Sequence, residues 1–244
     1  MNKIILDKKA SFNFRIVAGI EFISILIILV ILDQFFLVPS IIPQWTCVFL
    51  IPFSYIWVII AKQKAVYPHS FKKHPVCYLG QSFVFGKDNH QAMLWVQGFF
   101  IGLALDYIIT GLLLRNYFLF NPYLQITACG LYLGAVLAIF MGIVPIDLYR
   151  KFHLITTFTL FGLHITTTIV ILSYFIYMGH YSVFVPIIAY VGCAVHLIGS
   201  TLYLIAYITQ RKASLFQNAW FFGTFIGLWA CNTGLIEIAK VISV

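Results

Sequence analysis

Residues 152–178 read FHLITTFTLFGLHITTTIVILSYFIYM, and residues 183–208 read VFVPIIAYVGCAVHLIGSTLYLIAYI. Neither stretch contains Lys, Arg, Asp or Glu. A transmembrane helix needs about 20 consecutive, mostly apolar residues, so each stretch is long enough to cross a bilayer. The connection between them is short, which predicts two antiparallel helices that pack as neighbours. These two stretches therefore indicate a helical membrane protein.

The rest of the chain repeats the pattern. It is 62% hydrophobic and 9% charged, with a mean hydropathy of +0.98, whereas a soluble domain is about 25% charged. Five more apolar stretches lie outside the opening pair, and the one with Pro52 is the shortest. We therefore expect an all-α, polytopic bundle of seven transmembrane helices in a single membrane domain, residues 1–244. The predicted spans are residues 14–36, 45–61, 93–114, 124–144, 152–178, 183–208 and 216–239.

The basic residues predict the orientation. Cytoplasmic loops of membrane proteins carry an excess of Lys and Arg. With seven spans, 13 of the 15 Lys and Arg residues fall on one side and only Arg115 and Lys240 on the other. The rich side holds the N-terminal arm, the long loop 62–91 and two short junctions. This predicts an N-terminus inside and a C-terminus outside. Without the span 45–61, the next basic loops would fall on the wrong side.

The net charge of +8 is explained by these helix-end residues, so we expect no nucleic-acid partner. The N-terminal apolar stretch is too long for the core of a cleavable signal and is not followed by a small-residue cleavage site. Membrane lipid is the expected surrounding partner. The charge pattern fits a cytoplasmic (inner) membrane, and an organellar inner membrane fits nearly as well.

Polar residues inside the predicted spans are the candidate ligand-binding residues, because such groups are costly in lipid and are often functional. They are Asp106, His164, His196, Glu21 and His153. On the fifth span, His153, Thr157, His164 and Thr168 fall on one helical face. On the sixth span, Gly192, His196, Gly199, Ser200 and Tyr203 form a similar stripe. The tight connection between the two spans predicts that His164 and His196 lie at similar depth.

Several roles are open for these two histidines. Each could simply hydrogen-bond a hydroxyl or carbonyl group across the bundle. The pair could bind a ligand or handle a proton. It could also supply the two axial ligands of a haem b. A metal site that joins His153 to His164 is excluded, because 11 helical residues separate them by about 16 Å. The carboxyl of Asp106 either bonds a carbonyl in its protonated form or pairs with a neighbouring histidine.

Other features have plainer interpretations. The glycine stripes at residues 98/102, 130/134/138/142 and 223/227, with alanine at 138, favour close helix packing. The cysteines lack metal-binding or redox spacing, and four lie in apolar segments, where packing is the expected role. The loop histidines, His69, His74 and His90, are expected to be solvated. The apolar patch at residues 76–85 is too short to cross and is expected to lie in the interface or fold under the bundle.

A resemblance adds to this. The run Gly142-Ile143-Val144-Pro145-Ile146-Asp147 precedes His153 at the head of the next span. Shorter runs include Tyr78-Leu79-Gly80, Gly98-Phe99-Phe100, Gly111-Leu112-Leu113 and Leu215-Phe216-Gln217, followed by a helix with Trp229. Together these resemble an uncharacterised prokaryotic membrane-protein family, a domain of unknown function with six helices, distantly similar to Frag/DRAM/Sfk-type proteins linked to lipid handling. The resemblance covers residues 45–240 and implies a membrane fold without an activity. In the span junction, a helix stop at Pro145, a helix N-cap at Asp147 and an interfacial His153 are expected.

No catalytic motif is present, so the sequence does not favour an enzyme. The leading prediction is a protein that binds a lipid or small apolar molecule, or moves a solute, through the intramembrane polar patch. A haem b electron carrier with His164 and His196 as axial ligands is the second prediction. The third is a structural subunit of a larger membrane complex, and self-association is also open.

Overall fold

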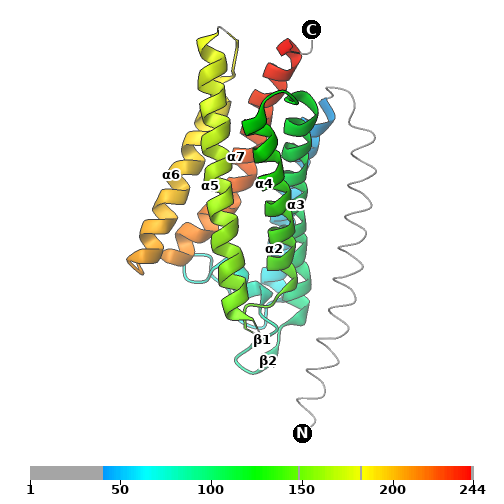
Figure 1. Cartoon of the computed structure of the whole chain (residues 1–244). Helices are drawn as coiled ribbons and strands as arrows, with labels where there is room; N and C mark the ends of the chain where they lie inside the picture. The colour runs from blue at the N-terminus through cyan, green and yellow to red at the C-terminus, as the bar shows by residue number, and fades with distance from the viewer. Residues whose placement is uncertain (1–40, 148, 182, 243–244) are drawn as a thin grey trace. The chain divides into compact units, whose positions relative to one another are not determined.

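The computed structural model describes residues 41–147, 149–181 and 183–242, with side chains from Phe49 onward. All of these residues belong to one compact unit, residues 39–244. The predicted span 14–36 and the candidate residue Glu21 lie outside the described residues. Within them the chain is a bundle of α-helices, shown in Figure 1. The helices are α2 (Ile41–Lys64), α3 (His90–Tyr117), α4 (Pro122–Ile143), α5 (Arg150–His180), α6 (Ile187–Ile208) and α7 (Ala213–Ile242).

Five of these described helices, α3 to α7, are long and apolar enough to cross a membrane. The all-α prediction and the assignment to a membrane are therefore supported. The helix α2 covers the predicted span 45–61 and has 24 residues. At 1.5 Å per residue its length is about 36 Å, which is enough to cross a hydrocarbon core. The number of seven spans and the direction of insertion stay predictions.

Helices that follow each other in the sequence pack side by side, as the short loops predict. The helix α3 contacts α2, α4 and α7 and is the most buried of the five. The helix α6 packs mainly on α7 and less on α5. Its other face is apolar and exposed, with Val191, Val195 and Ile198 each more than half exposed. Such a face suits lipid, and it leaves the α6–α7 contact as the main attachment of α6.

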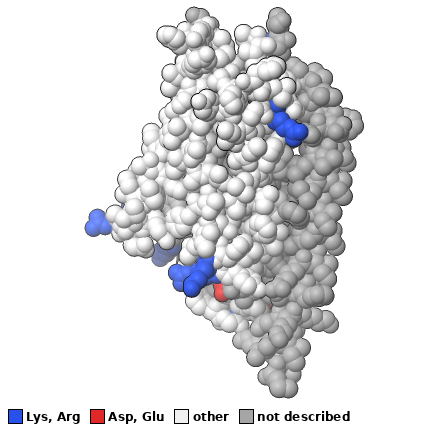
Figure 2. All heavy atoms as spheres, in the orientation of Figure 1, with Lys and Arg blue, Asp and Glu red and all other residues white. Residues whose placement is uncertain are grey.

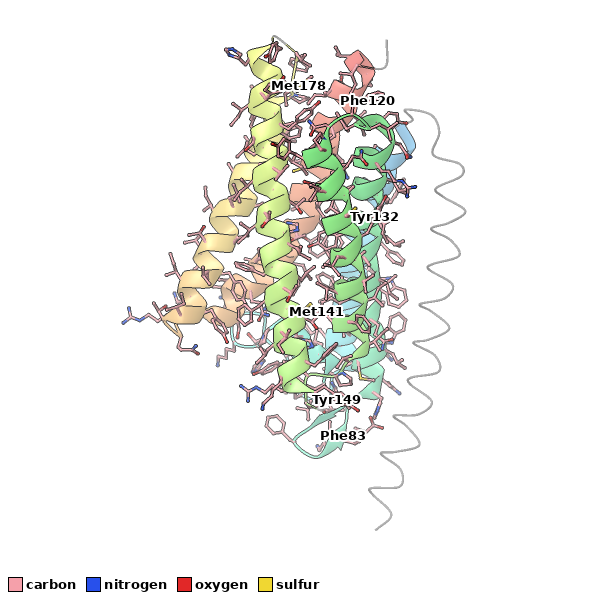
Figure 3. All side chains as sticks on the ribbon, in the orientation of Figure 1. Phe83, Phe120, Tyr132, Met141, Tyr149 and Met178 are labelled. Atoms are coloured by element: carbon pink, nitrogen blue, oxygen red, sulfur yellow. The ribbon has the colours of Figure 1, made fainter. Side chains whose placement is uncertain are left out.

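The two ends of the bundle differ in charge. One end holds the segment between α2 and α3, the α4–α5 junction and the α6–α7 turn. Together with the adjoining ends of α2 and α5, these carry nine of the eleven Lys and Arg residues from Lys62 onward. Figure 2 shows blue atoms toward the ends of the visible face and an uncharged middle. In Figure 3, Phe83 and Tyr149 mark the basic end, and Phe120 and Met178 mark the other. This division suits the positive-inside pattern.

The segment between α2 and α3 is ordered against the basic end of the bundle. It contains a short 3₁₀ helix, η1 (Val76–Gly80), with Val76, Cys77 and Leu79 buried. It also contains an antiparallel hairpin of β1 (Phe83–Val84) and β2 (Lys87–Asp88). The turn residues Phe85 and Gly86 both have positive φ values, 53° and 74°, as a two-residue hairpin turn requires.

Three polar side chains hold this segment: Asn89 and Asn218 are buried, and Asp147 is exposed. Asn218 of α7 accepts a hydrogen bond from the Val76 amide at 2.7 Å and donates to the carbonyls of Phe71 and His74. Asn89 donates to the carbonyls of Leu79 and Gln81. The Asp147 carboxylate accepts from the amides of Ser82 and Phe83 at 3.0 and 3.1 Å. Each of these side chains supplies hydrogen bonds that the irregular backbone would otherwise make to water.

Two sequence predictions fail here. Asp147 is not the N-cap of the following helix, because α5 begins at Arg150 and its N-cap position is Tyr149. Its carboxylate is engaged by the hairpin instead. His69 is not solvated: it is 5% exposed, and its Nδ1 lies 2.8 Å from the Tyr67 hydroxyl. The predicted helix stop before Pro145 is confirmed, since α4 ends at Ile143.

Glycines create the close contacts, although not always where the stripes predict. A Cβ on Gly98 would strike the Trp57 ring, and one on Gly142 would lie 3.1 Å from the Cβ of Phe100. Gly223, by contrast, faces open space. The α6–α7 contact depends on Gly192 and Gly234, where an added Cβ would collide with Ala230 and Ala189. Small residues on both helices thus bring the α6 and α7 backbones together.

Candidate functional site

His164 and His196 contact each other in the interior of the bundle. Nε2 of His164 lies 3.2 Å from Nδ1 of His196, and the ring centroids are 3.7 Å apart. The side chains are 2% and 4% exposed. His164 comes from α5 and His196 from α6, and both lie well inside their helices. The prediction that they lie at similar depth is confirmed, and the reason is the short α5–α6 connection.

The contact is the middle of a longer chain of hydrogen bonds. The Tyr107 hydroxyl of α3 lies 2.8 Å from Nδ1 of His164. At the other end, Oγ of Ser200 lies 3.3 Å from Nε2 of His196. Tyr107 and Ser200 are 2% and 0% exposed. We call the four side chains Tyr107, His164, His196 and Ser200 the polar chain. It joins three helices.

Every member of the polar chain can both donate and accept a hydrogen bond when both imidazoles are neutral. In one arrangement Tyr107 donates to His164, His164 to His196, and His196 to Ser200. In the other, Ser200 donates to His196, His196 to His164, and His164 to Tyr107. Both arrangements satisfy all three contacts with the same heavy-atom positions. Shifting each proton along its bond converts one into the other.

Aromatic rings of α5, α6 and α7 enclose the polar chain. The Trp220 ring centroid lies 6.2 Å from that of His164 and 6.5 Å from that of His196. Tyr203 stacks on Trp220 with an interplanar angle of 12°. Trp220 is 2% exposed, and within the described part of the chain its indole N–H has no acceptor. A buried donor of this kind is costly unless a further group accepts from it.

Asp106 lies next to Tyr107 in α3 and is fully buried. It interacts electrostatically with Tyr107 and with Cys231 of α7. Thr110, one turn later, donates to the Asp106 carbonyl at 2.9 Å. The carboxyl group is therefore enclosed in the interior of the bundle. It borders the polar chain through Tyr107.

His153 does not belong to this cluster. It lies 11 residues before His164 on the same helix, about 16 Å along the axis. Its Nδ1 donates to the Val144 carbonyl at 3.3 Å, and the side chain is 3% exposed. This contact ties the start of α5 to the end of α4. The interfacial His153 expected from the sequence is thus a buried residue with a structural partner.

The haem prediction meets a geometric difficulty. Metal–imidazole nitrogen bonds are about 2 Å long, so two axial ligands stand roughly 4 Å apart with the macrocycle between them. Here the two ring nitrogens are 3.2 Å apart and the rings touch. As placed, they leave no room for a porphyrin. Among the described residues no group of three or more His, Cys, Asp or Glu side chains is arranged for a metal ion.

A concavity lies outside the membrane-spanning helices, in the segment between α2 and α3. It has a volume of about 550 Å³ and is lined mainly by aromatic side chains. His69, which contacts its lining residue Tyr67, has a pKa lowered to about 4 by burial and by the nearby His74 and Lys62. Burial also raises the pKa of Tyr67 to about 12. Both side chains are neutral near pH 7.

Sequence reasoning found the two histidines and placed Ser200 on the correct face of α6. It did not assign Tyr107 or Trp220 to the site. Tyr107 could not be assigned from the sequence, because the rotation of α3 relative to α5 cannot be read from one helix. Trp220 lies near the start of α7, where an aromatic residue is normally taken as an interface anchor.

No protein-family model, curated protein or solved structure matches the chain. The resemblance of residues 45–240 to an uncharacterised membrane-protein family therefore stays a prediction.

Proposed function

We propose that this membrane protein binds the polar group of a lipid or small solute beside the polar chain, and that a proton moves along the chain as the ligand binds or is moved. One observation carries the proposal: four buried side chains from three helices form an unbroken hydrogen-bonded series that can be satisfied in two directions. Such a series can accept a proton at one end while it releases another at the other end.

The surroundings favour a ligand with an oxygen acceptor. The buried Trp220 N–H has no acceptor within the described residues and belongs to a ring close to both histidines. An ester, carboxyl or carbonyl oxygen would satisfy it. The remaining enclosure is aromatic and apolar, which suits the hydrocarbon part of an amphiphile.

Proton movement is tested with purified protein in liposomes that contain a pH-sensitive dye. A potassium diffusion potential is imposed with valinomycin, and internal acidification is followed. Wild-type vesicles are expected to acidify faster than empty vesicles, whereas His164→Phe and His196→Phe vesicles should match empty ones. His180→Phe is the matched control, because His180 lies on α5 but is exposed at its end. Wild-type rates equal to those of empty vesicles would overturn the proton-transfer part of the proposal.

Ligand binding is tested separately, by solvent extraction and mass spectrometry of the purified proteins. A lipid or acid that copurifies with wild type and His180→Phe, but is depleted in Trp220→Phe, would support the proposed acceptor. Equal amounts of the copurified molecule in all three proteins would contradict the role proposed for the Trp220 N–H.

A further inference from the structure

Two thiols lie in contact in the α6–α7 interface, close to the polar chain but not part of it. Sγ of Cys193 is 3.3 Å from Sγ of Cys231. Both are free cysteines, and both are buried, at 0% and 3% exposure. Their separation in the sequence is 38 residues, so sequence spacing gave no sign of the pair.

The backbone around the pair is suited to a covalent link. Gly192 precedes Cys193, Ala230 precedes Cys231, and an added Cβ on Gly192 would collide with Ala230. The two helices therefore approach as closely as their small residues permit. A disulfide needs Cβ atoms about 4 Å apart and sulfur atoms about 2 Å apart. The two Sγ atoms are already 3.3 Å apart, and rotation about the Cα–Cβ bonds can bring them closer.

We propose that Cys193 and Cys231 form a dithiol/disulfide redox site whose oxidant is a lipid-soluble quinone. In the reaction the two S–H bonds break and one S–S bond forms. The two electrons and two protons pass to the quinone, which becomes a hydroquinone. A quinone fits because it accepts two electrons and two protons and dissolves in the hydrocarbon region that helices as long and apolar as α6 and α7 cross.

A disulfide at this site would restrain the movement of α6. The helix α6 is attached mainly to α7 and less to α5. A Cys193–Cys231 bond would fix α6 to α7 one helical turn from His196. The assignment does not depend on proton movement along the polar chain, and either can fail without the other.

The test counts reactive thiols in the full-length protein. Protein in liposomes is treated with a short-chain alkyl benzoquinone, quenched in acid, denatured and alkylated with N-ethylmaleimide, and its intact mass is measured. The chain has five cysteines, so reduced protein takes five labels. Oxidised wild type is expected to take three, and dithiothreitol should restore five. Peptide mapping should find Cys193 joined to Cys231.

Variants make the assignment specific. Cys193→Ser and Cys231→Ser should each take four labels before and after quinone. Cys129→Ser, at an exposed position, is the matched control and should fall from four labels to two. Five labels on quinone-treated wild type would overturn the proposal, as would a crosslink between any other pair of cysteines. The wild-type result needs no variant, so a folding defect in a serine variant would leave the test decisive.

Discussion

Tyr107 is the residue that connects α3 to the histidine pair, and its hydroxyl is the only part of the side chain that a phenylalanine would remove. Hydrogen bonds between transmembrane helices contribute on average about 0.6 kcal/mol and at most about 1.7 kcal/mol. We therefore expect Tyr107→Phe to lower the free energy of unfolding by about 1 kcal/mol, measured by denaturant titration in mixed micelles. Tyr123→Phe is the control, because that ring is 73% exposed, and it should be neutral. Equal effects of the two substitutions would contradict the Tyr107–His164 bond.

His69 gives the segment between α2 and α3 a pH dependence. Its pKa is lowered to about 4 in the folded protein, mainly by burial, against about 6.5 when unfolded. The unfolded segment therefore binds more protons between these values, and stability falls as pH is lowered from about 6.5 toward 4.

We expect amide hydrogen exchange in residues 66–80, corrected for its intrinsic pH dependence, to lose protection over that pH window. His69→Gln should remove most of the change. Because His74 is close to His69, His74→Gln is the informative comparison and should preserve most of it. If the pH response is unchanged in His69→Gln, a group other than His69 causes it.

At the scale of elements, α6 and α7 are joined by glycine contacts that a single methyl group should disturb. Gly192→Ala places a Cβ against Ala230, and overpacking of this kind costs about 1–3 kcal/mol. Gly199→Ala on the same helix meets nothing within 4 Å and should be neutral or slightly stabilising, since alanine favours helix by about 1 kcal/mol. Thermal unfolding in detergent compares the two. A larger loss of thermal stability in Gly199→Ala than in Gly192→Ala would contradict the packing described for α6.

Asp147 links the hairpin β1–β2 to the α4–α5 junction. Its exposed carboxylate accepts two backbone hydrogen bonds, and a typical intramolecular hydrogen bond contributes about 0.5–1.5 kcal/mol. Asp147→Ala should therefore raise amide exchange and protease cleavage in residues 81–89 while leaving the α3–α7 core protected. Glu237→Ala, which removes an acidic group near the other end of the bundle, serves as the control. An unchanged hairpin in Asp147→Ala would show that the carboxylate does not hold it.

The elements themselves could largely be predicted, since apolar length marks membrane helices strongly. The structure extends most predicted spans by a few residues, and it starts the sixth later, at Ile187 after Pro186. The structure of the segment between α2 and α3 was harder to predict from the sequence. Its η1 helix and hairpin are held by Asn89, Asp147 and Asn218, which are distant from one another in the sequence. No local sequence pattern predicts hydrogen bonds between such distant residues. The sequence therefore favoured a helix N-cap for Asp147.

At the scale of the whole molecule, sequence periodicity placed His164 and His196 on inward faces but could not give their partners. Partners depend on how each helix is rotated and shifted against its neighbours. That is why Tyr107, Trp220 and the Cys193–Cys231 contact emerged only from the folded bundle. The charge division between the two ends was predictable, because it is a property of loop composition alone.

The two buried imidazoles share a hydrogen bond inside the bundle. Solid-state NMR of ¹⁵N-histidine-labelled protein in liposomes can detect this bond through the scalar coupling that an N–H···N bond transmits. We predict one Nε2–Nδ1 cross-peak between two histidines, absent from both His164→Phe and His196→Phe and present in His180→Phe. A wild-type spectrum without that cross-peak, or a cross-peak that persists after either His164 or His196 is replaced, would show that the two imidazoles do not share a hydrogen bond.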